Sequence, residues 1–173
     1  MVRREEITLS SLPSLEDESL RMAAVYLPPK NGLVGVFLPL GSVVDAGDLD
    51  AMWNAPTKVT DRRGLLIFPI GAAIGEILTS TEEDLDLEEC LRQVVVDSAD
   101  LCSAIMVSEA ANTIVVRFTG VKIQADSSLY SSILGSIPTS ITACVVCAMR
   151  KRPVVVLDEL ISQDRILARL RAE

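Results

Sequence analysis

A single dipeptide, Asn31-Gly32, constrains the fold of this chain more than any other local feature. It follows Pro28 and Pro29 and separates two apolar, β-prone stretches, residues 22–27 and 33–40. Asn-Gly is among the strongest short-range signals for a two-residue β-hairpin turn, because both residues accept positive φ angles. The sequence therefore predicts an antiparallel pair of strands at this point.

The rest of the chain mixes short apolar stretches with longer stretches of helical periodicity. We expect strands over residues 65–69, 104–109, 113–121 and 153–157, and helices over residues 14–21, 48–53, 71–78, 82–102, 127–134, 138–151 and 162–172. Hairpins combined with crossovers predict an α+β fold, with a mixed, largely antiparallel sheet and helices packed on at least one face. We expect a single domain over residues 1–173, with residues 1–21 as an N-terminal arm.

The composition bears on partners and location. Hydrophobic residues make up 49% of the chain but aromatic residues only 3%, so the apolar surface is aliphatic. Such a surplus either builds a dense core or is hidden against a second copy, and we expect a homodimer. The net charge of −8 argues against a nucleic-acid partner. Residues 127–149 are uncharged but rich in hydroxyls, so we expect no membrane span and a cytoplasmic protein.

Histidine is absent from the chain. Its absence removes Ser-His-Asp and Cys-His catalysis, histidine acid–base chemistry and histidine metal sites. No other cluster of polar residues converges in the sequence, and we predict no cofactor. The first hypothesis is therefore a non-catalytic intracellular domain that acts through self-association or partner binding.

The segment over residues 135–140 supports an alternative hypothesis. It places Gly135, Ser136, Thr139 and Ser140 at the predicted start of a helix, where free backbone N–H groups and the helix dipole favour anions. These residues are the candidate binding residues of a small-molecule or anion binder, which could also be an enzyme. The same hydroxyls could instead cap the helix and satisfy its backbone.

The cysteines support a third hypothesis, thiol redox chemistry or metal binding. Cys144 and Cys147 form a CxxC pair, and Cys90 and Cys102 bring the number of thiols to four. The pair lies in the middle of a predicted helix rather than at its start, where the dipole would activate a thiol. Cys90 and Cys102 do not have zinc-knuckle spacing, so we expect no metal site and treat Cys144 and Cys147 as outside candidates.

Three segments together resemble a loosely defined set of uncharacterised archaeal proteins. They are Gly64-Leu-Leu-Ile-Phe-Pro entering an apolar helix and then an acidic one, the strand over residues 113–120, and the 135–140 segment followed by a small-residue helix and Arg152-Pro153-Val154-Val155-Val156. The resemblance covers roughly residues 60–160. It implies a fold of the kind described above and carries no activity with it.

Overall fold

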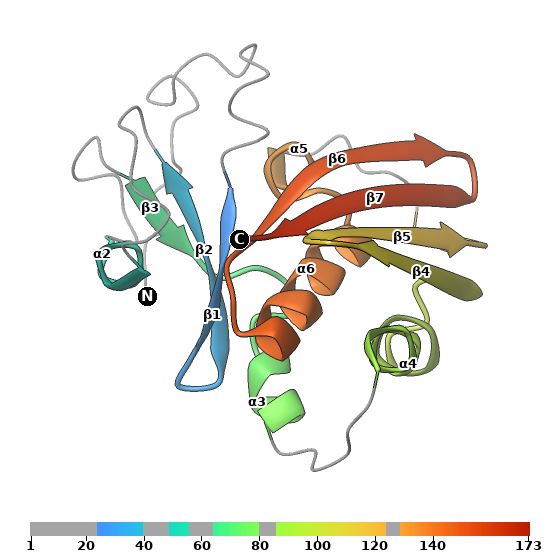
Figure 1. The fold of residues 1–173 in the computed structure, drawn as a ribbon. Coiled ribbons are helices and arrows are strands. Elements are labelled where there is room, and N and C mark those ends of the chain that lie inside the picture. The colour runs from blue at the N-terminus through green and yellow to red at the C-terminus, as the bar shows by residue number, and fades with distance from the viewer. Residues whose placement is uncertain (1–23, 40–48, 56–63, 80–85, 124–128) are drawn as a thin grey trace, which may run out of the picture.

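A computed structural model of the protein describes residues 24–39, 49–55, 64–79, 86–123 and 129–173. Its centre is a seven-stranded sheet in the order β3-β2-β1-β6-β7-β5-β4 (Figure 1). The strands are β1 (Val25–Lys30), β2 (Leu33–Pro39), β3 (Gly64–Ile67), β4 (Ala104–Ala110), β5 (Thr113–Thr119), β6 (Val154–Ser162) and β7 (Arg165–Ala172). All described neighbouring strands are antiparallel. The predicted α+β class is confirmed.

Two-residue turns build the sheet from three hairpins, β1–β2, β4–β5 and β6–β7. Asn31 and Gly32 have φ angles of 53° and 78°. Positive φ at both central residues is the type I′ geometry, whose twist matches that of the flanking strands. The hairpin predicted from Asn31-Gly32 is therefore confirmed.

Five α-helices and one π-helical segment accompany the sheet in the described residues. They are α2 (Leu49–Trp53), α3 (Ile74–Thr79), α4 (Leu87–Leu91), η2 (Arg92–Ser98), α5 (Leu129–Leu134) and α6 (Ile137–Arg150). Figure 1 shows α3, α4 and α6 on one side of the sheet, whereas α2 lies at the far end beside β2 and β3. The predicted helix over residues 14–21 and the predicted N-terminal arm over residues 1–21 lie outside the described residues.

The predicted helix over residues 82–102 is shorter than expected at its C-terminal end. Its described part begins after Asp86, whose side chain accepts a hydrogen bond from the Glu89 N–H at 2.8 Å. It continues through η2 and ends at Ser98, and Asp100 has a φ of 52°. Leu101 and Cys102 are still buried, so they join the core from a loop.

The predicted C-terminal helix over residues 162–172 is wrong, because these residues form the end of β6, a turn and β7. The buried side chains of β7 are Ile166, Ala168, Leu170 and Ala172, which alternate with exposed or half-buried neighbours. Ile166 and Leu170 are four residues apart, a spacing that fits one face of a helix and one face of a strand equally well. The segment forms a strand because it pairs with β5 on one side and with β6 on the other.

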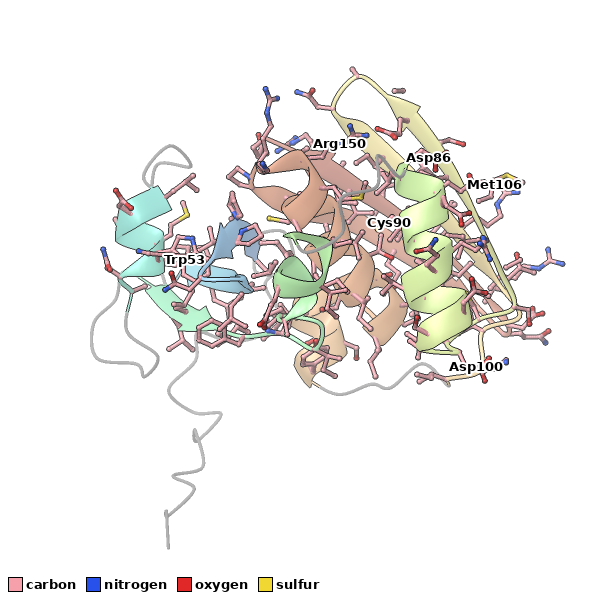
Figure 2. All side chains as sticks on the ribbon, turned by 90° about the horizontal axis from the view of Figure 1, so that it is seen from below. Trp53, Asp86, Cys90, Asp100, Met106 and Arg150 are labelled. Atoms are coloured by element: carbon pink, nitrogen blue, oxygen red, sulfur yellow. The ribbon has the colours of Figure 1, made fainter. Side chains whose placement is uncertain are left out.

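The core lies between the sheet and α6, whose residues 138–147 are all buried. A second, smaller cluster occupies the opposite face of the sheet under α2 and contains Leu27, Phe37, Met52 and Leu66. There Gly35 lets the Trp53 ring approach β2, because a Cβ on Gly35 would lie 3.0 Å from that ring. Figure 2 shows Trp53 at the end of the molecule far from Met106.

Candidate functional site

The start of α6, predicted as an anion site, is occupied by a carboxylate of the same chain. Glu159 on β6 accepts a hydrogen bond from the Ser136 N–H at 3.0 Å and from the Ser136 hydroxyl at 2.5 Å. The Thr139 hydroxyl also donates to it. A helix N-terminus favours a negative charge through its free N–H groups and its dipole. Glu159 therefore supplies the charge that an outside anion would otherwise bring.

The structure brings the four candidate binding residues together but leaves their side chains little access to solvent. Ser136 is 7% exposed, and Thr139 and Ser140 are fully buried, while Gly135 is half-buried with a φ of 81°. The hydroxyls of Ser136 and Thr139 are engaged by Glu159. This arrangement caps and satisfies the first turn of α6, in the way that N-cap residues do.

Sequence reasoning missed Glu159, because the predicted strand over residues 153–157 ends before it, and a β-bulge decides which way this residue points. Val154 and Val156 point toward α6, since their partners on β7 are Ala172 and Leu170. The register then shifts by one residue between Val156 and Asp158. Glu159 therefore faces α6 where simple alternation would have placed Asp158.

A second polar group, centred on Ser140, connects four parts of the fold. The Tyr26 hydroxyl of β1 lies 2.9 Å from Ser140 Oγ and 3.0 Å from the Leu134 carbonyl oxygen. The Tyr130 hydroxyl lies 3.0 Å from Ser140 Oγ and accepts a hydrogen bond from the Ile70 N–H. Burial raises the pKa of Tyr26 well above its usual value, so its hydroxyl stays protonated and donates. The network holds β1, α5 and α6 together.

The CxxC cysteines are buried on α6 and point to different neighbours. Cys144 Sγ lies 3.9 Å from the carbonyl oxygen of Ile70, and Cys147 Sγ lies 3.4 Å from the carbonyl oxygen of Tyr26. Burial raises the pKa of Cys144 to about 12 and also raises the pKa of Cys147. Since the thiolate is the reactive form, this burial disfavours reaction of both thiols at neutral pH. The described residues contain no group of three or more Cys, Asp or Glu placed to hold a metal ion.

The other distinctive surface is the side of β4 to β7 that faces away from α6, which we call the open face. Its residues that reach solvent are Ala104, Met106, Ser108, Ala110, Thr113, Val115, Arg117, Thr119, Asp158, Leu160, Ser162, Arg165, Leu167, Arg169 and Arg171. The helical segments α4, η2 and α6 pack on the opposite, buried side of these strands (Figure 1).

One row of side chains crosses the open face from strand to strand. Leu160 of β6 pairs with Leu167 of β7, which lies beside Arg117 of β5, and Arg117 pairs with Met106 of β4. Leu160 and Met106 are 66% and 57% exposed, although both are large apolar side chains. The row therefore presents apolar surface on both sides of an arginine.

The remaining charges of the open face form ion pairs along β6 and β7. Arg169 Nε donates to both carboxylate oxygens of Asp158, at 2.7 and 2.9 Å. This pairing lowers the pKa of Asp158 and raises that of Arg169. The sequence could not reveal this face, because three of its arginines were placed on a predicted helix.

No family model, no curated protein and no solved structure matches the chain. The resemblance to uncharacterised archaeal proteins therefore stays a prediction. Among the described residues, no helix is both long enough and apolar enough to cross a membrane.

Proposed function

We propose that this chain is a non-catalytic binding domain that contacts another polypeptide through the open face. The observation that carries the proposal is the row Leu160–Leu167–Arg117–Met106, which exposes apolar side chains around an arginine on an antiparallel sheet. Arginine and methionine are enriched in protein–protein interfaces, and apolar anchors beside them supply the burial that binding needs.

The two alternative sites support binding less well. At the start of α6, the hydroxyls of Ser136 and Thr139 already serve Glu159. The thiols of Cys144 and Cys147 are fully buried and form hydrogen bonds to backbone carbonyl oxygens. By contrast, the side chains of the open face reach solvent, so a partner can contact them without any rearrangement of the core.

The chain offers a matched pair of positions to test this proposal by photo-crosslinking. Met106 on the open face is 57% exposed, and Ile77 on α3, on the helical side of the sheet, is 58% exposed. A photo-reactive benzoylphenylalanine is placed at one or the other position, and the protein is irradiated in its native cells. We expect a discrete adduct from position 106 and none from position 77, as judged by the mass of the products.

A second copy of the chain or a different polypeptide in that adduct would each support binding through the open face. Equal adducts from the two positions, or none from position 106, would contradict it. Replacing Leu160 by serine on the far side of the row should weaken the adduct, because the apolar area available to the partner decreases.

A further inference from the structure

We infer that the partner of the open face is an acidic, amphipathic stretch of polypeptide, in which a carboxylate is flanked by apolar side chains. This inference rests on the function proposed above and names the chemistry of the partner. Three observations carry it: the sign of the charge on the face, one arginine without an acidic neighbour, and the apolar side chains beside that arginine.

The charge of the open face is opposite to that of the chain. The strand residues on this face include four arginines, Arg117, Arg165, Arg169 and Arg171, and one acid, Asp158, whereas the other two acids of these strands, Glu109 and Glu159, lie on the opposite side. The chain as a whole has a net charge of −8. A positive surface on an acidic protein attracts acidic partners selectively, because complementary charge steers association and like charge opposes it.

The arginines differ in how far they are already neutralised. Arg169 is paired with Asp158, and Arg171 donates to Glu173 at 2.8 Å through Nε. Arg165 lies 3.9 Å from a carboxylate oxygen of Asp164. Among the described residues, Arg117 has no acidic partner at all. A planar guanidinium in this position is suited to a carboxylate, which it binds through two parallel hydrogen bonds.

The neighbours of Arg117 specify what must surround that carboxylate. Leu167 and Met106 lie on the two adjacent strands, at the spacing of about 4.8 Å that separates hydrogen-bonded strands. Leu160 lies one strand further out. A partner that places an acid over Arg117 therefore lays its flanking side chains on leucine and methionine, and apolar flanking residues bury the most surface there.

The same observations disfavour two other occupants. Two open faces stacked on each other would place two arginine-rich surfaces against each other, and like charges across an interface oppose association. A nucleic acid would find no aromatic side chain on the face for its bases to stack on, and the net charge of −8 would repel its phosphates.

The test uses a defined probe, a fluorescein-labelled peptide of about ten residues that is long enough to cross the four strands. Every second residue is serine, and the residues between them alternate between leucine and glutamate, so one face of the extended peptide presents a carboxylate between leucines. A peptide with lysine in place of glutamate and a single-stranded oligothymidine are the controls. Binding to the full chain is measured by fluorescence anisotropy at low salt and at about 0.3 M salt, where screening is strong. The variants are Arg117→Glu and, as a control with the same charge change, Arg150→Glu on α6, whose exposed pair with Glu109 lies off the open face.

We expect the leucine–glutamate peptide to bind at least about tenfold more tightly than the leucine–lysine peptide, and to weaken as salt is added. Arg117→Glu should reduce its affinity at least about tenfold, whereas Arg150→Glu should change it less than about twofold. Arg117→Met, which keeps the length of the side chain, should give an intermediate loss. Circular dichroism of each variant verifies that the fold is retained.

Equal binding of the two peptides, no binding of either, or an unchanged affinity in Arg117→Glu would overturn the inference. Oligothymidine binding that depends on Arg117 would also overturn it. An adduct from position 106 that joins two open faces would keep the proposed function and overturn the acidic partner. The absence of any adduct from that position would instead remove the proposed function itself.

Discussion

The start of α6 and the open face both carry polar side chains, but these side chains differ in burial and in their hydrogen-bond partners. At the start of α6, the polar atoms of Ser136, Thr139 and Ser140 are buried and satisfied by groups of the same chain. On the open face, Arg117 is exposed and has no acidic partner among the described residues. A buried polar group must form its hydrogen bonds within the fold, whereas water can satisfy an exposed polar group until a partner binds it.

Two adjacent carboxylates on β6 show how close the two regions are. Asp158 points to the open face and pairs with Arg169, and Glu159 points inward and caps α6. Neighbouring strand residues point to opposite sides, and the bulge after Val156 decides that Glu159 is the one that points inward. The comparison predicts that neighbouring residues with the same charge contribute very differently to stability.

The largest expected effect is the loss of Glu159. We expect Glu159→Ala to lower the free energy of unfolding by about 3 kcal/mol, because hydrogen bonds to a charged group are lost. The Ser136 N–H and one of the hydroxyls of Ser136 and Thr139 then lose their acceptor, since the two hydroxyls can form only one hydrogen bond with each other. Asp158→Ala is the matched control and should cost less than about 1 kcal/mol, since it breaks an exposed ion pair. Urea denaturation of both variants measures the difference. Equal losses would mean that the start of α6 is no more closed than the open face.

The next effect concerns the buried thiols of α6 at alkaline pH. The pKa of Cys144 is raised from 9 to about 12 and that of Cys147 is raised as well, so the unfolded chain releases these protons first as the pH rises. Stability is therefore fully present below pH 9 and is lost as the pH rises toward 12. We expect a loss of about 1 kcal/mol per thiol by pH 10.

Urea denaturation between pH 8 and pH 10 measures this alkaline loss. The double variant Cys144→Ala, Cys147→Ala is the control, and its stability should depend less on pH over the same range. At pH 8, a thiol reagent should leave both cysteines of the folded protein unmodified. Rapid modification at that pH would show that the interior of α6 is accessible and would revive the redox hypothesis.

The smallest effect compares two threonines on α6. Thr139 donates to Glu159, whereas the buried hydroxyl of Thr142 has no hydrogen-bond partner among the described residues. We expect Thr142→Val to raise the free energy of unfolding by up to about 1 kcal/mol and Thr139→Val to lower it by about 1–2 kcal/mol. Thermal denaturation of the two variants gives the signs. A loss in Thr142→Val would indicate that its hydroxyl is satisfied in solution.

Much of the fold could be predicted because it depends on neighbours in sequence. The turn at Asn31-Gly32 requires only two residues that accept positive φ, and the start of α6 requires only Ser136 as a cap followed by Pro138. These features were accessible because their physical cause lies within a few residues of the chain.

The candidate sites could be predicted only in part. Ser136, Thr139 and Ser140 were identified as a helix start, but their partners Glu159 and Tyr26 lie at least 20 residues away in sequence. The open face was not identified, because Ile166 and Leu170 fit a helix as well as a strand. Local propensity is a weak guide when a segment pairs with strands on both sides.

By itself, the sequence determined the hairpin turn, the start of α6 and an aliphatic core without histidine chemistry. Only the tertiary structure decided that β7 is a strand, that Glu159 rather than Asp158 turns inward, and that Arg117 lies among apolar side chains on an exposed sheet. The physical reason is that strand pairing and register depend on contacts between distant segments, and a single bulge reverses which side chains are buried.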